Sequence, residues 1–299
     1  METILITGGS GLIGKHLQKL LITKGFAVTI LSSKRTSNSF YWNIDSGEID
    51  REAIIQADHI IHLAGANIGE KRWTTKQKQL ILDSRIKSAQ LLFDSIKKGE
   101  HKPKTFISAS AVGYYGAITT EHIFTETDEP ANDFLGSVCA EWEKAANKFE
   151  KLGIRVVKLR TGVVLTQQGG VLERITTPFK YGFGAAIGSG KQYFPWIHID
   201  DLCEIYYKAI VDETMNGAYN AVAPQYCTNK EFTAAVAQTL QKPLFFPAIP
   251  AFVLRMLFGK MADLLLKGSR ISSSKIIDCQ FYFQYSTLQQ ALSQLLKSK

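Results

Sequence analysis

The chain has 299 residues, of which 45% are hydrophobic and 21% charged, a composition typical of a globular protein with an ample core. A formal net charge of +8 suggests nucleic-acid binding, but Lys and Arg are scattered along the chain, so we expect a solvated surface and no nucleic-acid partner. The four cysteines show neither metal-ligand nor redox spacing, which predicts free thiols and no metal site. No leader precedes the first apolar run, and charges interrupt the longest one, residues 249–266. We therefore expect a cytoplasmic protein without a membrane span.

The first 25 residues predict a strand, a tight turn and a helix. Residues 3–7 are apolar and β-branched, as in a buried parallel strand, and from Leu12 the apolar residues follow helical spacing until Gly25. Between them, Gly9-x-Gly11-x-x-Gly14 satisfies the dinucleotide fingerprint, in which N–H groups at a helix N-terminus receive a pyrophosphate. The expected cofactor-binding residues of this segment are Gly8, Gly9, Ser10, Gly11, Leu12, Ile13 and Gly14.

The end of the second predicted strand, residues 26–31, selects between the two nicotinamide cofactors. An NAD enzyme usually carries Asp or Glu there for the ribose 2′-hydroxyl, whereas an NADP enzyme holds a 2′-phosphate. Here the strand continues into Ser32-Ser33-Lys34-Arg35, with no acid in reach, and an arginine can bind phosphate bidentately. We therefore expect NADP (NADPH), bound by Ser32, Ser33, Lys34 and Arg35.

The glycine loop, Thr7-Gly8-Gly9-Ser10-Gly11-Leu12-Ile13-Gly14, resembles the cofactor loop of the extended short-chain dehydrogenase/reductases. Later segments resemble one subfamily, the so-called NAD-dependent epimerase family proteins of mammals and bacteria, with a C-terminal segment like DUF1731. The segments that carry this resemblance are Arg72-Trp73-Thr74, residues 108–116, residues 196–201 and residues 259–265.

The resemblance implies an α/β fold with a Rossmann-like, doubly wound parallel sheet and a smaller, mainly helical C-terminal substrate lobe. It places an NADP-binding domain at residues 1–165, with the sheet completed by about residues 197–222, and the lobe at residues 166–196 and 223–299. It also implies that small residues after the strand at 58–64 pass beside the cofactor. The further cofactor-binding residues expected are Leu63, Ala64, Gly65, Ala66 and Ser108.

Candidate catalytic hydroxyls follow the strand at residues 105–110, because the carboxyl ends of parallel strands border the ligand crevice. They are Ser110, Tyr114 and Tyr115. Tyr115 is preferred because it precedes Gly116, in the Tyr-Gly pair that many extended enzymes place beside the substrate. The superfamily's Tyr-x-x-x-Lys pair is absent from the next helix, at residues 134–142. The alternative is that both tyrosines only form a pocket wall.

Four polar residues are candidates for the substrate pocket: Arg85, Arg160, Lys191 and His198. Arg85 stands where many extended enzymes carry a catalytic Asn, and His198 has a structural role as its alternative. A second apolar helical face, between residues 253 and 265, is expected to pack inside the C-terminal lobe.

Two classes of function follow from these residues. The first is an NADP(H)-dependent oxidoreductase or epimerase-like enzyme acting on a small carbonyl or sugar-like substrate. The second is a catalytically reduced NADPH-binding sensor that acts through a partner. The glycine loop serves both, and the missing Tyr/Lys pair favours the second without deciding. The sequence names no substrate, and a homodimer stays open.

Overall fold

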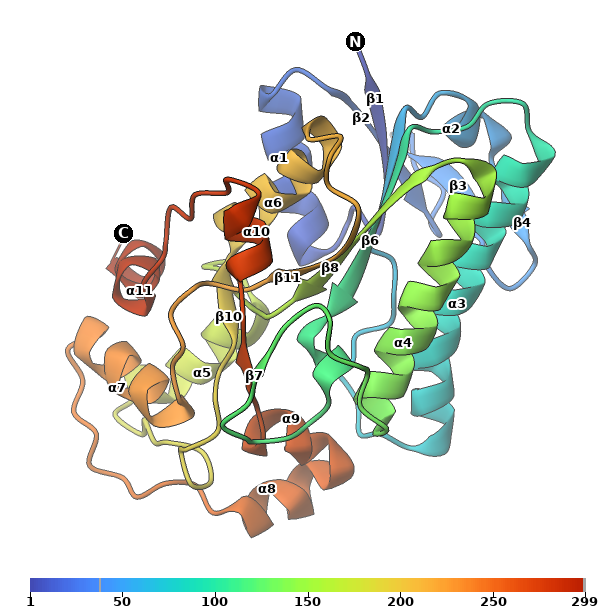
Figure 1. The fold of residues 1–299 in the computed structure, drawn as a ribbon. Coiled ribbons are helices and arrows are strands. Elements are labelled where there is room, and N and C mark those ends of the chain that lie inside the picture. The colour runs from blue at the N-terminus through green and yellow to red at the C-terminus, as the bar shows by residue number, and fades with distance from the viewer. Residues whose placement is uncertain (38, 298–299) are drawn as a thin grey trace.

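The computed structural model describes residues 1–37 and 39–297, and it is organised around one eight-stranded sheet (Figure 1). The order across the sheet is β11-β8-β6-β5-β1-β2-β3-β4, and all neighbours are parallel except β3 and β4. The strands are β1 (Thr3–Thr7), β2 (Ala27–Ser32), β3 (Phe40–Asn43), β4 (Glu48–Ile49), β5 (His59–His62), β6 (Thr105–Ala111), β8 (Arg155–Thr161) and β11 (Gly217–Ala221). The strand order reverses between β1 and β5, which places a ligand crevice at their carboxyl ends and confirms the predicted doubly wound class.

Helices cover both faces of this sheet (Figure 1). The alternation of side chains along β1 builds the two layers, since Ile4 and Ile6 join one buried cluster and Leu5 joins the other. The first cluster is closed by α1 (Leu12–Thr23) and α6 (Ile199–Val211). The second is closed by α2 (Arg51–Ile55), α3 (Thr75–Lys98), α4 (Phe134–Asn147) and the 3₁₀ helix η2 (Lys148–Leu152).

Side-chain caps fix where most of the longer helices begin. Thr74 accepts a hydrogen bond from the N–H of Gln77 at the start of α3, and Asp133 accepts one from Gly136 at the start of α4. Thr228 forms a reciprocal capping box with Glu231 at the start of α7 (Asn229–Thr239). Each of these three helix starts is therefore set by the side chain directly before the helix.

The remaining elements form a smaller lobe beside the carboxyl ends of the strands. Two parallel strand pairs join it to the sheet, β9 (Val163–Leu165) with β10 (Trp196–His198) and β7 (Ile123–Phe124) with β12 (Arg270–Ile271). A third buried cluster lies among three of its helices. The further helices are α5 (Gly170–Lys180), α8 (Ala251–Phe258), α9 (Asp263–Leu266), α10 (Ser274–Asp278), α11 (Leu288–Lys297), and the 3₁₀ helices η1 (Val112–Tyr115) and η3 (Gly259–Ala262).

The C-terminal segment returns to the eight-stranded sheet instead of forming a separate body. Ile276 and Phe281 belong to the core cluster that also contains α1 and α6. Asp201, in the first turn of α6, accepts hydrogen bonds from the N–H groups of Gln284 (2.8 Å) and Tyr285 (3.0 Å). Residues 276–283 are therefore part of the same core as the first strand, whereas α11 belongs to the third cluster.

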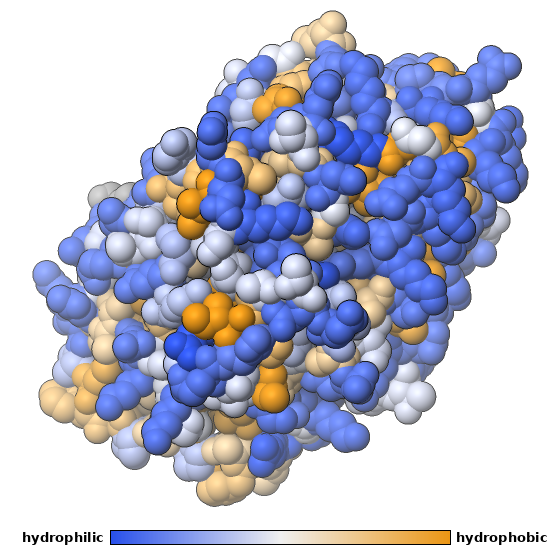
Figure 2. All heavy atoms as spheres, in the orientation of Figure 1, coloured by the Kyte–Doolittle hydropathy of each residue, from blue (hydrophilic) through white to orange (hydrophobic). Residues whose placement is uncertain are grey.

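The predicted apolar face is buried or half-buried except at Leu257, which is 54% exposed; its residues are Val253, Leu254, Leu257, Met261, Leu264 and Leu265. Helix α8 also carries Phe252 and Met256, which lie outside that face and are 70% and 69% exposed. In the view of Figure 2, apolar side chains appear at the end of the molecule where Figure 1 places α8. In the described part of the chain, no helix combines the length and apolar character that a membrane crossing requires.

Candidate functional site

The turn between β1 and α1 is built so that only glycine fits at its tightest points. Gly8 has a φ of +70°, and a Cβ on it would lie 2.9 Å from the backbone N of Ala64. A Cβ on Gly14 would lie 2.6 Å from the Cα of Gly9, so the first turn of α1 packs directly on the loop. The loop is further held by Gln18, whose side-chain amide donates to the carbonyls of Gly9 and Gly14.

The N-terminus of α1 is open to a ligand. No side chain caps this helix, in contrast to α3, α4 and α7. Its first turn also carries no acid. A Cβ built on Gly11 would meet only the carbonyl oxygen of Gly8, at 3.2 Å, and both Ser10 and Gly11 are exposed. Uncapped N–H groups behind an accessible glycine fit the pyrophosphate of a dinucleotide.

At the end of β2, the exposed Arg35 guanidinium stacks over the ring of Tyr41, 3.9 Å from its centre. Ser32 turns the chain here, because its hydroxyl accepts from the N–H of Lys34. The expectation that no acid lies in reach is wrong, since β4 brings Glu48 to 3.4 Å from Arg35. Both partners are exposed, so this ion pair is weak and a phosphate can replace the carboxylate.

The segment after β5 runs against the glycine loop, as its predicted cofactor role requires. The Thr7 hydroxyl accepts from the N–H of Ala64 and lies 2.8 Å from Nδ1 of His62. Arg85 donates from Nη1 to the carbonyl of Ala66, and its side chain lies against Gly65. Arg85 therefore holds the backbone of residues 65 and 66 in place.

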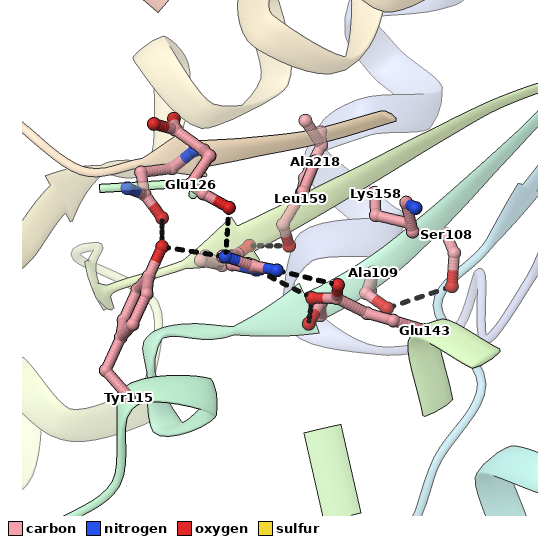
Figure 3. A network of polar contacts seen from close by, with 12 residues as sticks. Ser108, Ala109, Tyr115, Glu126, Glu143, Lys158, Leu159 and Ala218 are labelled. Carbon is pink, nitrogen blue, oxygen red and sulfur yellow. Dashed lines mark hydrogen bonds and ion pairs between the residues drawn. The ribbon is translucent and has the colours of Figure 1, made fainter. Parts of the chain in front are cut away.

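A buried polar network lies where β6 and β8 end (Figure 3). Its centre is a bidentate pair in which Arg160 donates from Nε to Oε1 of Glu143 (2.8 Å) and from Nη2 to Oε2 (3.0 Å). The Ser110 hydroxyl donates to the same carboxylate, at 2.7 Å. The Tyr115 hydroxyl accepts from Nη1 of Arg160 (2.9 Å) and donates to Oδ1 of Asn220 (2.7 Å).

This network occupies the hydroxyls that the sequence assigned to catalysis. Tyr115 is only 1% exposed, and burial raises its pKa to about 12, so it holds its proton firmly in the bond to Asn220. Ser110 is buried, and so is Ser108, whose hydroxyl donates to the backbone of Ala109. Tyr114 is half-buried, and the Arg160 guanidinium lies 3.4 Å from the centre of its ring.

Helix α4 presents two apolar residues at the spacing where the superfamily places its Tyr-x-x-x-Lys pair. Leu135 and Cys139, four residues apart, both lie against Gly113 of η1. Burial raises the pKa of the Cys139 thiol to about 12, so it stays protonated at neutral pH. This face of α4 therefore supplies no acid or base to the crevice.

A pocket of about 860 Å³, part of it open to solvent, begins directly after β6 and extends to the C-terminal lobe. Its walls come from η1, α4, β9 and α5, from residues 187–195, and from the segment around α9. The apolar residues that line it include Val112, Leu135, Val163, Ile175, Phe194, Leu264, Leu265 and Ile271. It is therefore a concave, mainly apolar site beside the strand ends.

The structure does not bring the four predicted pocket residues to this pocket. Arg160 forms a buried ion pair with Glu143, and Arg85 donates a hydrogen bond to the backbone carbonyl of Ala66. Lys191 is exposed on a loop. His198 is buried as the N-cap of α6, where its Nδ1 accepts from the N–H of Asp200 at 3.1 Å, so its structural alternative holds.

Sequence reasoning missed the partners that come from distant segments. Glu143, Asn220 and Tyr41 carried no motif, although a glutamate on the buried face of α4 signals that an internal cation is needed. Gln192, which lines the pocket, was also missed, because no spacing rule singles out one amide in a loop. Among residues 1–37 and 39–297, no three His, Cys, Asp or Glu side chains gather as metal ligands.

Two family profiles match the chain. Residues 4–221 match the NAD dependent epimerase/dehydratase family, and residues 249–295 match a domain of unknown function, DUF1731. An epimerase family protein of Mycobacterium leprae is 36% identical over 293 residues, which are 97% of this chain and 94% of that protein. The epimerase family protein YfhF of Bacillus subtilis is 36% identical over 302 residues, with 99% and 98% covered.

Solved structures show the same arrangement. The crystal structure of human epimerase family protein SDR39U1 with NADPH has a TM-score of 0.90 and 31% identity, and covers 99% of this chain and 100% of that one. UDP-glucose 4-epimerase of Thermotoga maritima, solved with UDP-glucose, has a TM-score of 0.76 and covers 99% and 97%. At 20% identity, that second likeness shows the fold alone.

Proposed function

Since the chain belongs to the NAD dependent epimerase/dehydratase family, we propose that it is an NADPH-dependent oxidoreductase of the extended short-chain class that reduces a small carbonyl compound. The observation that carries the proposal is the uncapped N-terminus of α1 behind Gly11, with a solvent-open pocket beginning directly after β6. An anion-binding helix end beside a concave apolar pocket suits a dinucleotide and a second reactant.

The cofactor would be held along the carboxyl edge of the sheet. The pyrophosphate fits the turn from Gly8 to Gly14, and the 2′-phosphate fits Lys34 and Arg35, which stacks on Tyr41. The human relative solved with NADPH supports this cofactor. We assign cofactor binding to residues 1–165 and about 197–222, and the substrate lobe to residues 166–196 and 223–299.

Bound NADPH supplies a hydride, so this chain must position the substrate and let a proton reach its oxygen. The Tyr115 and Ser110 hydroxyls already donate hydrogen bonds within the network, to Asn220 and Glu143. Of the residues on α4, Leu135 and Cys139 lie against η1, and Glu143 is paired with Arg160. We therefore assign the proton to solvent water, which the open side of the pocket admits. Tyr114 is the half-buried hydroxyl that competes with water for this role.

A second candidate function is an NADPH sensor that acts through a partner. The observation in its favour is the apolar character of Leu135 and Cys139, because a site selected for catalysis would hold an ionisable pair there. The cofactor cradle alone does not separate the two functions.

The test is substrate-dependent NADPH oxidation across a broad panel of aldehydes and ketones. We expect turnover with at least one compound in the wild type and none in Gly11→Val, whose side chain fills the cradle. Gly99→Val is the matched control, since a Cβ at Gly99 makes only ordinary contacts, at 3.6 Å or more. Tight NADPH binding with no oxidation across the panel would refute the enzyme and support the sensor.

A further inference from the structure

The charges around the pocket do not suit a nucleotide sugar. Among its lining residues, Asp263 and Lys267 are the charged ones, and they pair with each other at 3.4 Å. Arg255, from α8, also approaches Asp263, at 3.9 Å. A diphosphate entering this pocket would meet apolar walls, a carboxylate and one cation that is already paired. Desolvating two phosphate charges without cations to receive them is strongly unfavourable.

One polar atom in the pocket wall lacks a partner. Gln192 lines the pocket, is 3% exposed, and donates from Nε2 to the carbonyls of Ile187 and Leu265, both at 2.9 Å. These two bonds fix the orientation of the amide, because only the nitrogen can donate to two carbonyls. Its Oε1 is buried and has no hydrogen-bond partner among the described residues. A buried acceptor left in this state is unfavourable, and a donor on a ligand would remove that cost.

We propose that the pocket takes an uncharged, apolar carbonyl compound that carries one hydroxyl or N–H group, and that this group donates to Oε1 of Gln192. The inference rests on the proposed function and deepens it by naming the substrate class. Apolar walls bind the body of the molecule, the amide sets its orientation, and the carbonyl lies toward the end of β6. The same walls exclude nucleotide sugars.

The experiment measures binding separately from turnover. Calorimetry with saturating NADP⁺ is run on aromatic aldehydes and cyclic ketones, each as a matched hydroxyl and methyl-ether pair, and on UDP-glucose. We expect a hydroxyl form to bind about 2- to 13-fold more tightly than its ether, as one neutral hydrogen bond predicts, and UDP-glucose to give no binding. Gln192→Met should remove the difference within each pair.

A second variant keeps the test valid if Gln192→Met loosens the loop. Leu264→Asp places a carboxylate on the apolar wall and should weaken binding of the preferred compound about tenfold or more. Leu257→Asp, on the exposed side of α8, should leave it unchanged. UDP-glucose binding, equal affinity for hydroxyl and ether, or no binding across the panel would each overturn the inference. Binding as expected without NADPH oxidation would refute the proposed function alone.

Discussion

The buried Arg160–Glu143 pair gives the sharpest prediction about stability. Both side chains are less than one-tenth exposed, and the carboxylate receives two bonds from Arg160 and one from Ser110. In Glu143→Gln the shape is kept, but the charge of Arg160 is left without compensation and the new amide NH₂ faces another donor. Breaking one side of such a pair costs about 3–5 kcal/mol. Unfolding entropy is about 2.1 cal/mol/K per residue, so for 299 residues each kcal/mol shifts the Tm by about 1.6 °C. The Tm should therefore fall by about 5–8 °C.

The assay is thermal and urea unfolding of the two glutamine variants of α4. Glu141→Gln is the control, because Glu141 pairs with Lys144 at 3.2 Å on the exposed side of the same helix and should change stability by less than about 1 kcal/mol. Replacing both partners, Glu143→Leu with Arg160→Met, should be less harmful than Glu143→Leu alone, since no lone charge remains. Equal losses for Glu143→Gln and Glu141→Gln would refute the reasoning.

Three further predictions concern the cofactor and the residues around it. Arg35→Ala should narrow the preference for NADPH over NADH by about 1.5–3 kcal/mol. Glu48→Gln should widen that preference by up to about 1 kcal/mol, because the Glu48 carboxylate competes with the 2′-phosphate for Arg35. Calorimetry with both cofactors measures the preference, and an unchanged value in Arg35→Ala contradicts the assignment of the 2′-phosphate. Tyr115→Phe should cost about 1–3 kcal/mol of stability and change turnover less than tenfold, whereas a 10²–10⁴-fold loss of turnover would make Tyr115 the proton donor. Burial lowers the pKa of His62 from 6.5 to about 4, so stability that is present above pH 6.5 should be lost as the pH falls toward 4, by up to about 3 kcal/mol. His62→Asn should flatten the pH dependence of the urea-unfolding free energy between pH 6.5 and 4. An unchanged slope in this variant would contradict the prediction.

The parts of the fold that sequence predicts well are those specified by neighbouring residues. The turn at Gly8 needs a positive φ, and Thr74 and Asp133 each accept a hydrogen bond from the N–H group three residues ahead in the helix that they cap. Local chemistry is therefore sufficient for these features. The doubly wound parallel class also follows, because a strand-helix alternation with a glycine turn leaves few topologies.

The site is less predictable because its chemistry depends on contacts between distant segments. Arg160 stands at a strand end, where a pocket cation is expected, yet Glu143 from another element neutralises it. Glu48 reaches Arg35 only because β4 folds back beside β3. The orientation of the Gln192 amide is fixed by hydrogen bonds to two backbone carbonyls, one of them 73 residues away in sequence. None of these pairings leaves a periodicity or a spacing in the sequence.

The return of residues 270–285 to the sheet has a consequence for synthesis on the ribosome. Asn220 of β11 donates to the carbonyl of Ser272, Lys275 donates to the carbonyl of Ala218, and Asp201 receives two bonds from residues 284 and 285. When residue 221 emerges, the cofactor-binding sheet is complete in sequence, but one of its edges lacks the segment that satisfies it. Domains usually fold as units, N-terminal first, during translation. Here the edge of the sheet at β11 is completed only when residues 270–285 have been made, so a nascent chain halted before residue 270 exposes an unfinished core to chaperones and proteases.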